Sequence, residues 1–225
     1  MITTVLIDVD NTLLDFNACA EATIKKQFIK WNLKYDESVF PVFRAVNDML
    51  WCKIETGEIN KPTLYQLRWK TIFECLGTAA DGPLFEQEFR EAFSESRQAV
   101  EGAYEILEYL SEKYTVCVAS NASYQQQIKR LTNAGMMNYI THIFNSEQIG
   151  FPKPEKRFFD VCFERLGNVP KENTVLIGDS LTADIKGGVE YGIKTIWFNY
   201  DKLPVTNDIK ADYIVDSLEQ IKNNL

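Results

Sequence analysis

The hydrophobic positions along the chain follow two different periods. Near the start, apolar and β-branched side chains run without interruption from Thr3 to Ile7 and lead into two aspartates, Asp8 and Asp10. A short unbroken run that ends in polar residues predicts a buried β-strand. Over residues 16–98, large apolar side chains instead recur every three or four positions, which predicts helices.

The segment 16–98 is therefore expected to be an all-helical insert, a small bundle with short connections. Its four helices are predicted over 17–31, over 38–55, from Asn60 through Phe73, and through Phe85 to about Gln98. The insert is rich in aromatic residues, among them Trp31, Trp51 and Trp69. Two interpretations stay open for these tryptophans: a stacking surface for a nucleobase, or the aromatic core of the bundle.

Helices and strands alternate from Gly102 onward. Helices are predicted over 103–113, 124–135, 155–166 and 182–191 and at the C-terminus, and strands over 114–119, 140–144, 173–177, 193–198 and 213–215. This alternation predicts a doubly wound parallel sheet, a Rossmann-like α/β fold with right-handed crossovers. The expected organisation is a core domain made of 1–15 and 99–225, into which the helical domain 16–98 is inserted.

Composition narrows the possible partners and the compartment. The 225 residues are 45% hydrophobic and carry a net charge of −8, which argues against a nucleic-acid polymer as partner. No apolar run is long enough to span a bilayer. The residues before the first strand include no basic segment and no cleavage site, so we expect no signal peptide. Five scattered cysteines without a Cys-x-x-Cys pair are expected to be buried free thiols in a reducing cytoplasm. The single histidine, His142, is expected to be structural.

Polar residues follow three of the predicted strands: Asp8 and Asp10, then Ser120 and Asn121, then Asp179. The carboxyl ends of parallel strands meet at one edge of the sheet, where ligands bind in this fold class. If the first strand continued, both of its carboxylates would point to the same side, and their repulsion would call for a cation such as Mg²⁺. The alternative is an ordinary Asx-rich turn after a strand.

Lys153 lies in a connection, between Pro152 and Pro154. The two prolines stiffen the backbone and disfavour a helix through the lysine. This setting predicts a lysine held for function, although a loop that enters a helix at Pro154 would look similar.

Taken together, these motifs resemble those of the haloacid dehalogenase superfamily, and in particular its phosphatases, over essentially the whole chain. The resemblance rests on Asp8-Val9-Asp10-Asn11-Thr12, Ser120-Asn121, Lys153, and Gly178-Asp179-Ser180-Leu181-Thr182-Ala183-Asp184, which match the four family motifs in order and spacing. The second motif departs from the usual pattern, because Ser120 stands where Thr is commoner and Ala122 where Gly is commoner. The helical insert resembles the cap domain of one large subgroup.

The resemblance implies a role for each matching residue. Asp8 would be the nucleophile that forms an aspartyl-phosphate, and Asp10 the general acid and base. Mg²⁺ would be held by Asp8, by the backbone carbonyl of Asp10 and by Asp179. The remaining assignments are phosphate binding by Thr12, by Ser120 and by the amides of Asn121 and Ala122, charge neutralisation by Lys153, and support of Lys153 or the metal by Asp184, which could instead be a solvated helix residue.

The resemblance also bears on the substrate. An aspartate at position 10 favours phosphate esters over organohalides, since a halide leaves without a proton. The stretch 46–59, followed by Arg68 and Trp69, resembles the cap of bacterial pyrimidine 5'-nucleotidases. We therefore expect a phosphatase for pyrimidine nucleoside 5'-monophosphates. Alternatives are a phosphoglycolate or sugar-phosphate phosphatase, a mutase, or a non-catalytic binding protein, with Trp51 and Arg68 serving cap packing and a surface ion pair.

Two further expectations concern assembly and motion. The protein is expected to be a monomer or a small homo-oligomer that binds a small phosphorylated substrate. The links near Asp15 and Val100 are expected to act as hinges for cap closure.

Overall fold

The computed structural model of the chain describes residues 1–205 and 208–225. Internal contacts divide it into two compact units, one made of 1–16 with 97–225 and the other of 17–96. The predicted domain boundaries, after residues 15 and 98, lie within two residues of these divisions. None of the helices in the described ranges is long and apolar enough to cross a bilayer.

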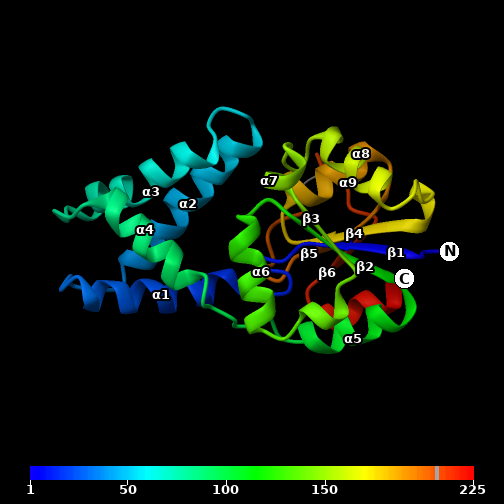
Figure 1. Cartoon of the computed structure of the whole chain (residues 1–225), viewed down its shortest axis with the longest axis horizontal. Helices are drawn as coiled ribbons and strands as arrows, with labels where there is room; N and C mark the ends of the chain where they lie inside the picture. The colour runs from blue at the N-terminus through cyan, green and yellow to red at the C-terminus, as the bar shows by residue number, and fades with distance from the viewer. Residues whose placement is uncertain (206–207) are drawn as a thin grey trace. The chain divides into compact units, whose positions relative to one another are not determined.

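The larger unit is built on one six-stranded sheet with the order β3-β2-β1-β4-β5-β6 (Figure 1). The strands are β1 (Thr4–Ile7), β2 (Thr115–Ser120), β3 (His142–Asn145), β4 (Thr174–Gly178), β5 (Lys194–Phe198) and β6 (Tyr213–Val215). All five strand pairs are parallel. The predicted Rossmann-like sheet is therefore confirmed, and its strand order reverses beside β1, between β1 and β4.

Helices cover both faces of this sheet (Figure 1). They are α5 (Ala103–Lys113), α6 (Tyr124–Asn133), α7 (Ser146–Ile149), α8 (Lys156–Arg165) and α9 (Lys186–Tyr191), with short helical turns η1 (Met137–Tyr139), η2 (Lys171–Asn173), η3 (Leu181–Ile185) and η4 (Leu218–Asn224). Val5 and Ile7 of β1 pack in one core with Leu107 of α5, whereas Leu6 packs on the other side with Phe158 of α8. Because both faces are buried, the strand carries an unbroken apolar run.

The smaller unit is helical, as its periodicity predicts. Its helices are α1 (Phe16–Lys30), which begins at the boundary, α2 (Val39–Glu55), α3 (Lys61–Leu76) and α4 (Gly82–Phe93). Trp69 is fully buried and its ring lies 4.3 Å from that of Phe85 and 5.8 Å from that of Phe43. Trp69 is therefore part of the aromatic core, whereas Trp31 and Trp51 are half-buried.

Three predicted helices differ from the observed ones in where they end, in continuity or in type. The fourth helix stops at Phe93 and does not reach Gln98, because the chain after it is extended and pairs with the end of the first motif. Gln98 accepts a hydrogen bond from the Asp15 amide at 2.9 Å, and Val100 donates one to Leu13 at 3.0 Å. The predicted helix over 182–191 is divided into a π-helical turn, η3, and α9, and the C-terminal helix is the 3-10 helix η4.

The cysteines depart from the expectation in one respect. All five are free, but only Cys19, Cys117 and Cys162 are buried, and Cys52 and Cys75 are exposed on the helical unit. Cys52 lies on α2 and Cys75 on α3, both at exposed positions, which composition alone could not show. His142 begins β3 and is exposed, with its ring stacked 5.9 Å from that of Phe144.

Candidate active site

The candidate site begins where β1 and β4 end side by side. Asp8 directly follows β1, and its amide donates a hydrogen bond to the carbonyl of Ile177 in β4 at 2.9 Å. Asp179 directly follows Gly178, the last residue of β4. Since the strand order reverses here, the crossovers diverge to opposite faces and leave the strand ends open to a ligand.

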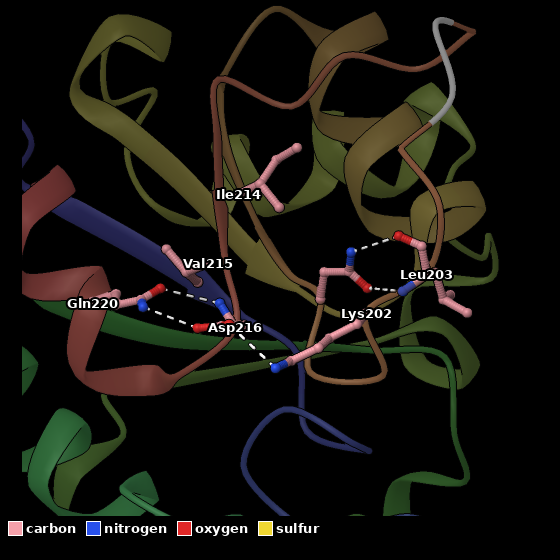
Figure 2. A pocket seen from close by; sticks show the side chains of 7 residues that line it. Lys202, Leu203, Ile214, Val215, Asp216 and Gln220 are labelled. Carbon is pink, nitrogen blue, oxygen red and sulfur yellow. Dashed lines mark hydrogen bonds and ion pairs between the residues drawn. The ribbon is translucent and has the colours of Figure 1, made fainter.

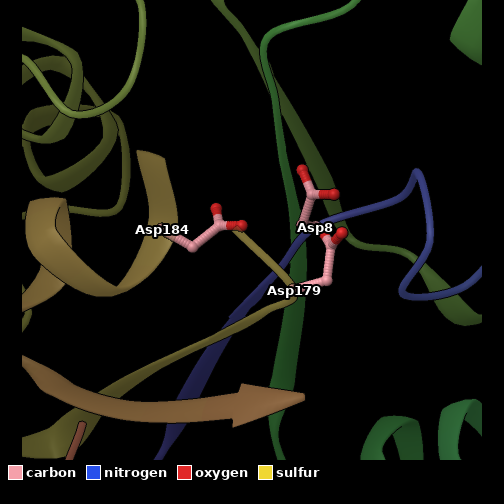
Figure 3. Close-up of side chains that lie close together, drawn as sticks. All are labelled: Asp8, Asp179 and Asp184. Carbon is pink, nitrogen blue, oxygen red and sulfur yellow. The ribbon is translucent and has the colours of Figure 1, made fainter. Parts of the chain in front are cut away.

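Three carboxylates gather at this point (Figure 3). Asp8, Asp179 and Asp184 each offer an oxygen, and these oxygens all lie within 4.8 Å of one another. Asp184 comes from η3 and points toward the two strand ends. Lys153 reaches the same cluster: its Nζ lies 2.7 Å from Asp8 Oδ1 and 2.6 Å from Asp184 Oδ1, and the residue is almost fully buried.

The pKa shifts in the cluster indicate that one lysine does not balance the three carboxylates. Burial raises the pKa of Asp8 to about 7, with the carboxylates of Asp184 and Asp10 acting in the same direction and Lys153 against it. The pKa of Asp179 is raised well above its usual value, first by burial and then by Asp8 and Asp184. Burial by itself would lower the pKa of Lys153, but the two carboxylates beside it raise it.

This donor set fits a hard divalent cation. If all three carboxylates are ionised, they and the one ammonium leave a net charge of −2 at the strand ends. Carboxylate oxygens are the ligands that Mg²⁺ prefers, and a divalent ion would neutralise the cluster. Asp8 and Asp179 would hold such an ion. Asp184 lies close enough to contribute an oxygen as well, besides its ion pair with Lys153.

Small structural features hold Asp184 and Asp179 in place. A Cβ atom at Gly178 would overlap the Asp184 carboxylate, so glycine allows this close approach. The Ser180 amide donates to Asp184 Oδ2 at 3.2 Å. On the neighbouring strand, Trp197 Nε1 donates to the backbone carbonyl of Asp179 at 2.9 Å. The Asp184 carboxylate and the backbone of Asp179 are therefore both held at the strand end.

Asn121, after β2, holds the loop that carries Lys153. Its side-chain oxygen accepts from the Lys153 amide at 2.8 Å, and its Nδ2 donates to the Lys153 carbonyl at 2.9 Å. Lys153 Nζ also donates to the carbonyl of Ala119 at 2.5 Å. The side chain of Asn121 thus serves the lysine, which leaves only its backbone amide for the predicted contact with phosphate.

Asp10 does not lie on a continuing strand, contrary to the geometry considered from the sequence. β1 ends at Ile7, and the chain then turns, with the amides of Leu13 and Leu14 both bonded to the Val9 carbonyl at 2.8 Å and Asn11 in the left-handed region at φ 58°. The turn gives Asp10 a different set of partners from Asp8. Its side chain contacts Gln127 and Arg130, which belong to α6.

Gln127 and Arg130 are the site residues that the sequence interpretation missed. Both are fully buried, although the surface of a helix is where such residues usually lie. A signal was present: Gln127 is four positions before the buried Leu131, so a polar residue occupies the inward stripe of the helix. Arg130 follows at i+3 on the same side.

The other predicted phosphate-binding residues lie in the segments that follow β1 and β2. Ser120 Oγ accepts from Gln127 Nε2 at 3.1 Å and from the Ala122 amide at 3.1 Å. Thr12 is fully buried, and its Oγ1 has no hydrogen-bond partner among residues 1–205 and 208–225. Phosphate binding by these groups stays a prediction.

A separate hollow of about 360 Å³ lies beside the ends of β5 and β6 (Figure 2). Its polar lining is satisfied internally: Asn199 exchanges two hydrogen bonds with the backbone of Leu203, and Gln220 exchanges two with Asp216. None of the three clustered carboxylates lines it. The candidate chemistry therefore lies at the β1–β4 strand ends and not in this hollow.

A doubly wound sheet with a buried lysine and three carboxylates at its switch point is an arrangement typical of enzymes. The sequence model of the haloacid dehalogenase-like hydrolases matches residues 2–192, and the chain belongs to that family. The family assignment based on the four motifs is confirmed.

Three relatives are similar over nearly their whole length. HAD-hydrolase YfnB of Bacillus subtilis is 34% identical over 97% of this chain and 93% of its own. The pyrimidine 5'-nucleotidases PynA of Streptococcus pneumoniae and YjjG of Escherichia coli are 31% and 27% identical, covering 96% and 98% of this chain and 92% and 96% of their own. A crystal structure of YfnB bound to magnesium matches with a TM-score of 0.94 at 33% identity and covers 100% of this chain and 98% of that one.

Proposed function

We propose that this hydrolase is a Mg²⁺-dependent phosphatase that works through an aspartyl-phosphate. The observation that carries the proposal is the Asp8 carboxylate at the switch point, paired with Lys153 at 2.7 Å and clustered with Asp179 and Asp184. A nucleophilic carboxylate must be ionised and must accept a second anion nearby, and Lys153 together with a bound cation would favour both.

In the first half-reaction, a carboxylate oxygen of Asp8 attacks phosphorus in line with the leaving oxygen. A bond forms between Asp8 and phosphorus, and the ester P–O bond breaks. Lys153, fixed beside Asp8, offsets negative charge that builds up around the nucleophile. Asp10, which enters this step as the carboxylic acid, gives its proton to the leaving oxygen as that oxygen departs.

The second half-reaction returns the enzyme to its starting state. Asp10, now a carboxylate, takes a proton from a water molecule that attacks phosphorus. The bond between phosphorus and Asp8 breaks, and inorganic phosphate leaves. Ser120, Thr12 and the amides of Asn121 and Ala122 are the groups that we assign to the phosphate oxygens.

A magnesium ion bound by Asp8, Asp179 and the carbonyl of Asp10 would supply charge neutralisation, so that one anion can approach another. The gathering of three carboxylates around one ammonium group supports this assignment. The magnesium-bound structure of the relative YfnB supports it independently.

The substrate class that we infer is a pyrimidine nucleoside 5'-monophosphate. Support comes from PynA and YjjG, which are pyrimidine 5'-nucleotidases similar over at least 96% of this chain. The aromatic helical unit supports it less than the sequence suggested, because Trp69 and Arg68 are committed to that unit's interior. Arg68 pairs with Glu86 through two bonds of 3.0 and 2.6 Å and is not the surface ion pair considered from the sequence.

Phosphate release from a substrate panel tests the proposal. The panel holds dUMP, UMP, dTMP, purine 5'-monophosphates, phosphoglycolate and several sugar phosphates, each with Mg²⁺ and again with EDTA. We expect Mg²⁺-dependent release with a preference for the pyrimidine nucleotides. Release from phosphoglycolate or sugar phosphates alone would keep the mechanism and refute the nucleotide assignment.

A variant of the nucleophile tests the mechanism itself. Asp8→Asn should lower turnover by at least about 10³-fold while the protein stays folded. Asp160→Asn, which changes an exposed carboxylate paired with Lys156, is the matched control and should keep wild-type activity. Full activity of Asp8→Asn would refute the aspartyl-phosphate.

The helical unit is proposed to act as a cap that closes during catalysis. The links that join the units are held in the core unit by the Leu14–Ala99 bridge, so bending is expected next to it, near Asp15 and Val100. The interdomain movement described for YfnB supports this proposal. Crystals with and without a phosphate analogue test it, and identical cap positions would count against it. A monomer or small homo-oligomer in the cytoplasm stays our expectation for assembly and location.

A further inference from the structure

The carboxylate of Asp10 is held by two side chains of α6. Gln127 Nε2 donates to Asp10 Oδ2 at 2.6 Å, and Arg130 Nη1 donates to Asp10 Oδ1 in an ion pair. Each oxygen of the carboxylate therefore has its own donor. Two donors that differ in position fix the plane of a carboxylate, whereas one donor would let it rotate.

The burial of this group is uneven. Gln127 and Arg130 are fully buried, while the side chain of Asp10 keeps 25% of its surface exposed. Burying a guanidinium is unfavourable unless it is well paired, so Arg130 is expected to stay in its ion pair. Of the two members of this ion pair, Asp10 is the one that reaches solvent. An ion pair that served stability only would not need an accessible carboxylate.

The same two side chains connect Asp10 to the end of β2. Gln127 Nε2 also lies 3.1 Å from Ser120 Oγ, and Arg130 Nη1 lies 3.4 Å from Gln127 Oε1. The arginine thus orients the glutamine as well as the carboxylate. Through Gln127, the position of Asp10 is coupled to the hydroxyl that we assign to phosphate binding.

Asp10 needs such support because it lies in a turn beyond the strand. Its backbone lies outside the six-stranded sheet and pairs locally with Leu14 in an isolated bridge. Proton transfer demands a carboxyl group within hydrogen-bond reach of the reacting oxygen, which this local pairing does not position. We propose that Gln127 and Arg130 are positioning residues that hold Asp10 for proton transfer to the leaving group and from water. The inference rests on the proposed phosphatase function and extends it to two residues outside the four motifs.

Substrates with different leaving groups should depend on the proton of Asp10 to different degrees. When Asp8 attacks an alkyl phosphate, the departing alkoxide needs the proton of Asp10 as the P–O bond breaks. When it attacks p-nitrophenyl phosphate, the nitrophenolate leaves without a proton, so this step does not need Asp10. In both cases, hydrolysis of the aspartyl-phosphate requires Asp10 to take a proton from the attacking water.

The test compares Arg130→Met with Lys129→Met, which removes an exposed cation one position away on the same helix. Rapid-quench kinetics with Mg²⁺ would use p-nitrophenyl phosphate and the nucleotide that the wild type hydrolyses best. Arg130→Met should slow phosphoryl transfer from the nucleotide about 10- to 100-fold, and from the aryl ester less than about threefold. Nitrophenol should therefore appear as a burst of about one equivalent per site, followed by slow turnover.

Two more variants guard against a folding defect in Arg130→Met. Gln127→Leu should show the same split between the two esters, more weakly, and Arg130→Lys should recover part of the nucleotide rate because it keeps the charge. Crystals of these variants should show the Asp10 carboxylate turned from its wild-type position.

Different experimental results would refute the phosphatase function and the positioning role of Gln127 and Arg130. Wild-type protein that hydrolyses neither ester would refute the phosphatase function and this inference with it. Two results obtained with an active wild type would refute the positioning role alone. In the first, Arg130→Met loses the same factor of activity on both esters and shows no burst. In the second, Arg130→Met behaves like Lys129→Met.

Discussion

The side chain of Asn121 and the backbone of Lys153 form two hydrogen bonds, one in each direction, at 2.8 and 2.9 Å. These residues are 32 positions apart, and the pairing imitates a short piece of β-ladder. The two hydrogen bonds hold the loop between Pro152 and Pro154 next to the residue that follows β2. The buried lysine consequently reaches Asp8 from a loop and not from a helix or strand.

Removing this pairing should loosen Lys153. Asn121→Ala leaves the Lys153 amide and carbonyl without their partner, and we expect it to destabilise the protein by about 1–3 kcal/mol. Turnover should fall about tenfold or more, because the ammonium is no longer fixed beside Asp8. Thermal unfolding and steady-state kinetics measure the two effects. Ser123→Ala, whose side chain makes no capping hydrogen bond, is the control, and equal behaviour of the two variants would contradict the prediction.

The stability of the metal-free protein should depend on pH through Asp8. Its pKa is raised from 3.8 to about 7 in the folded state, so the folded protein binds the extra proton between these values. The resulting stabilisation is present below about pH 4 and is lost as pH rises through 7. In EDTA, the wild type should therefore lose stability relative to Asp8→Asn as pH rises from 4 to 7. Denaturant unfolding at several pH values checks this, and a constant difference between the two proteins would contradict it.

Magnesium should stabilise the folded protein through the acidic cluster. At a hundredfold excess over Kd, a ligand that binds only the folded state adds about 2.7 kcal/mol, which thermal unfolding detects readily. Asp179→Asn should lose most of this gain, because it removes a ligand and a negative charge. Asp160→Asn should keep the full gain, since that carboxylate is exposed and pairs with Lys156. A metal response retained in Asp179→Asn would place the ion elsewhere.

The buried pair of Arg68 and Glu86 should serve the packing of the helical unit. Arg68 also donates to Asn47 at 3.0 Å, and burial raises the pKa of Glu86. Arg68→Met leaves a buried charge without its partner and should cost about 3–5 kcal/mol of stability. The double change Arg68→Met with Glu86→Leu should recover most of that loss, because two apolar side chains replace both charges.

Substrate selection provides the second readout for this pair. If Arg68 only packs the helical unit, the double variant should keep the wild-type KM for the best nucleotide. A large rise in KM with normal stability would instead return Arg68 to substrate binding.

Several features could be predicted from the sequence because they depend on local patterns. The unbroken run before Asp8 identified a strand buried on both faces, and the three-to-four spacing identified the helices of the insert. The order of motifs identified the family, and the strand ends indicated Asp8 and Asp179 as candidate site residues. The course of the chain after Ile7 was harder to predict, since the turn depends on hydrogen bonds from Leu13 and Leu14 back to Val9.

The sequence by itself determined the elements, the sheet class and the chemical groups at the strand ends. Only the tertiary structure decided which groups meet. It joined Asp8 to Lys153 across 145 positions and Asp10 to Arg130 across 120, so that two carboxylates only two residues apart received different partners. Periodicity reports which face of an element is buried, but not what lies against it. The partners of a buried charge are set by packing between segments that are distant in the sequence. The hydrophobic pattern of a single segment does not indicate that packing.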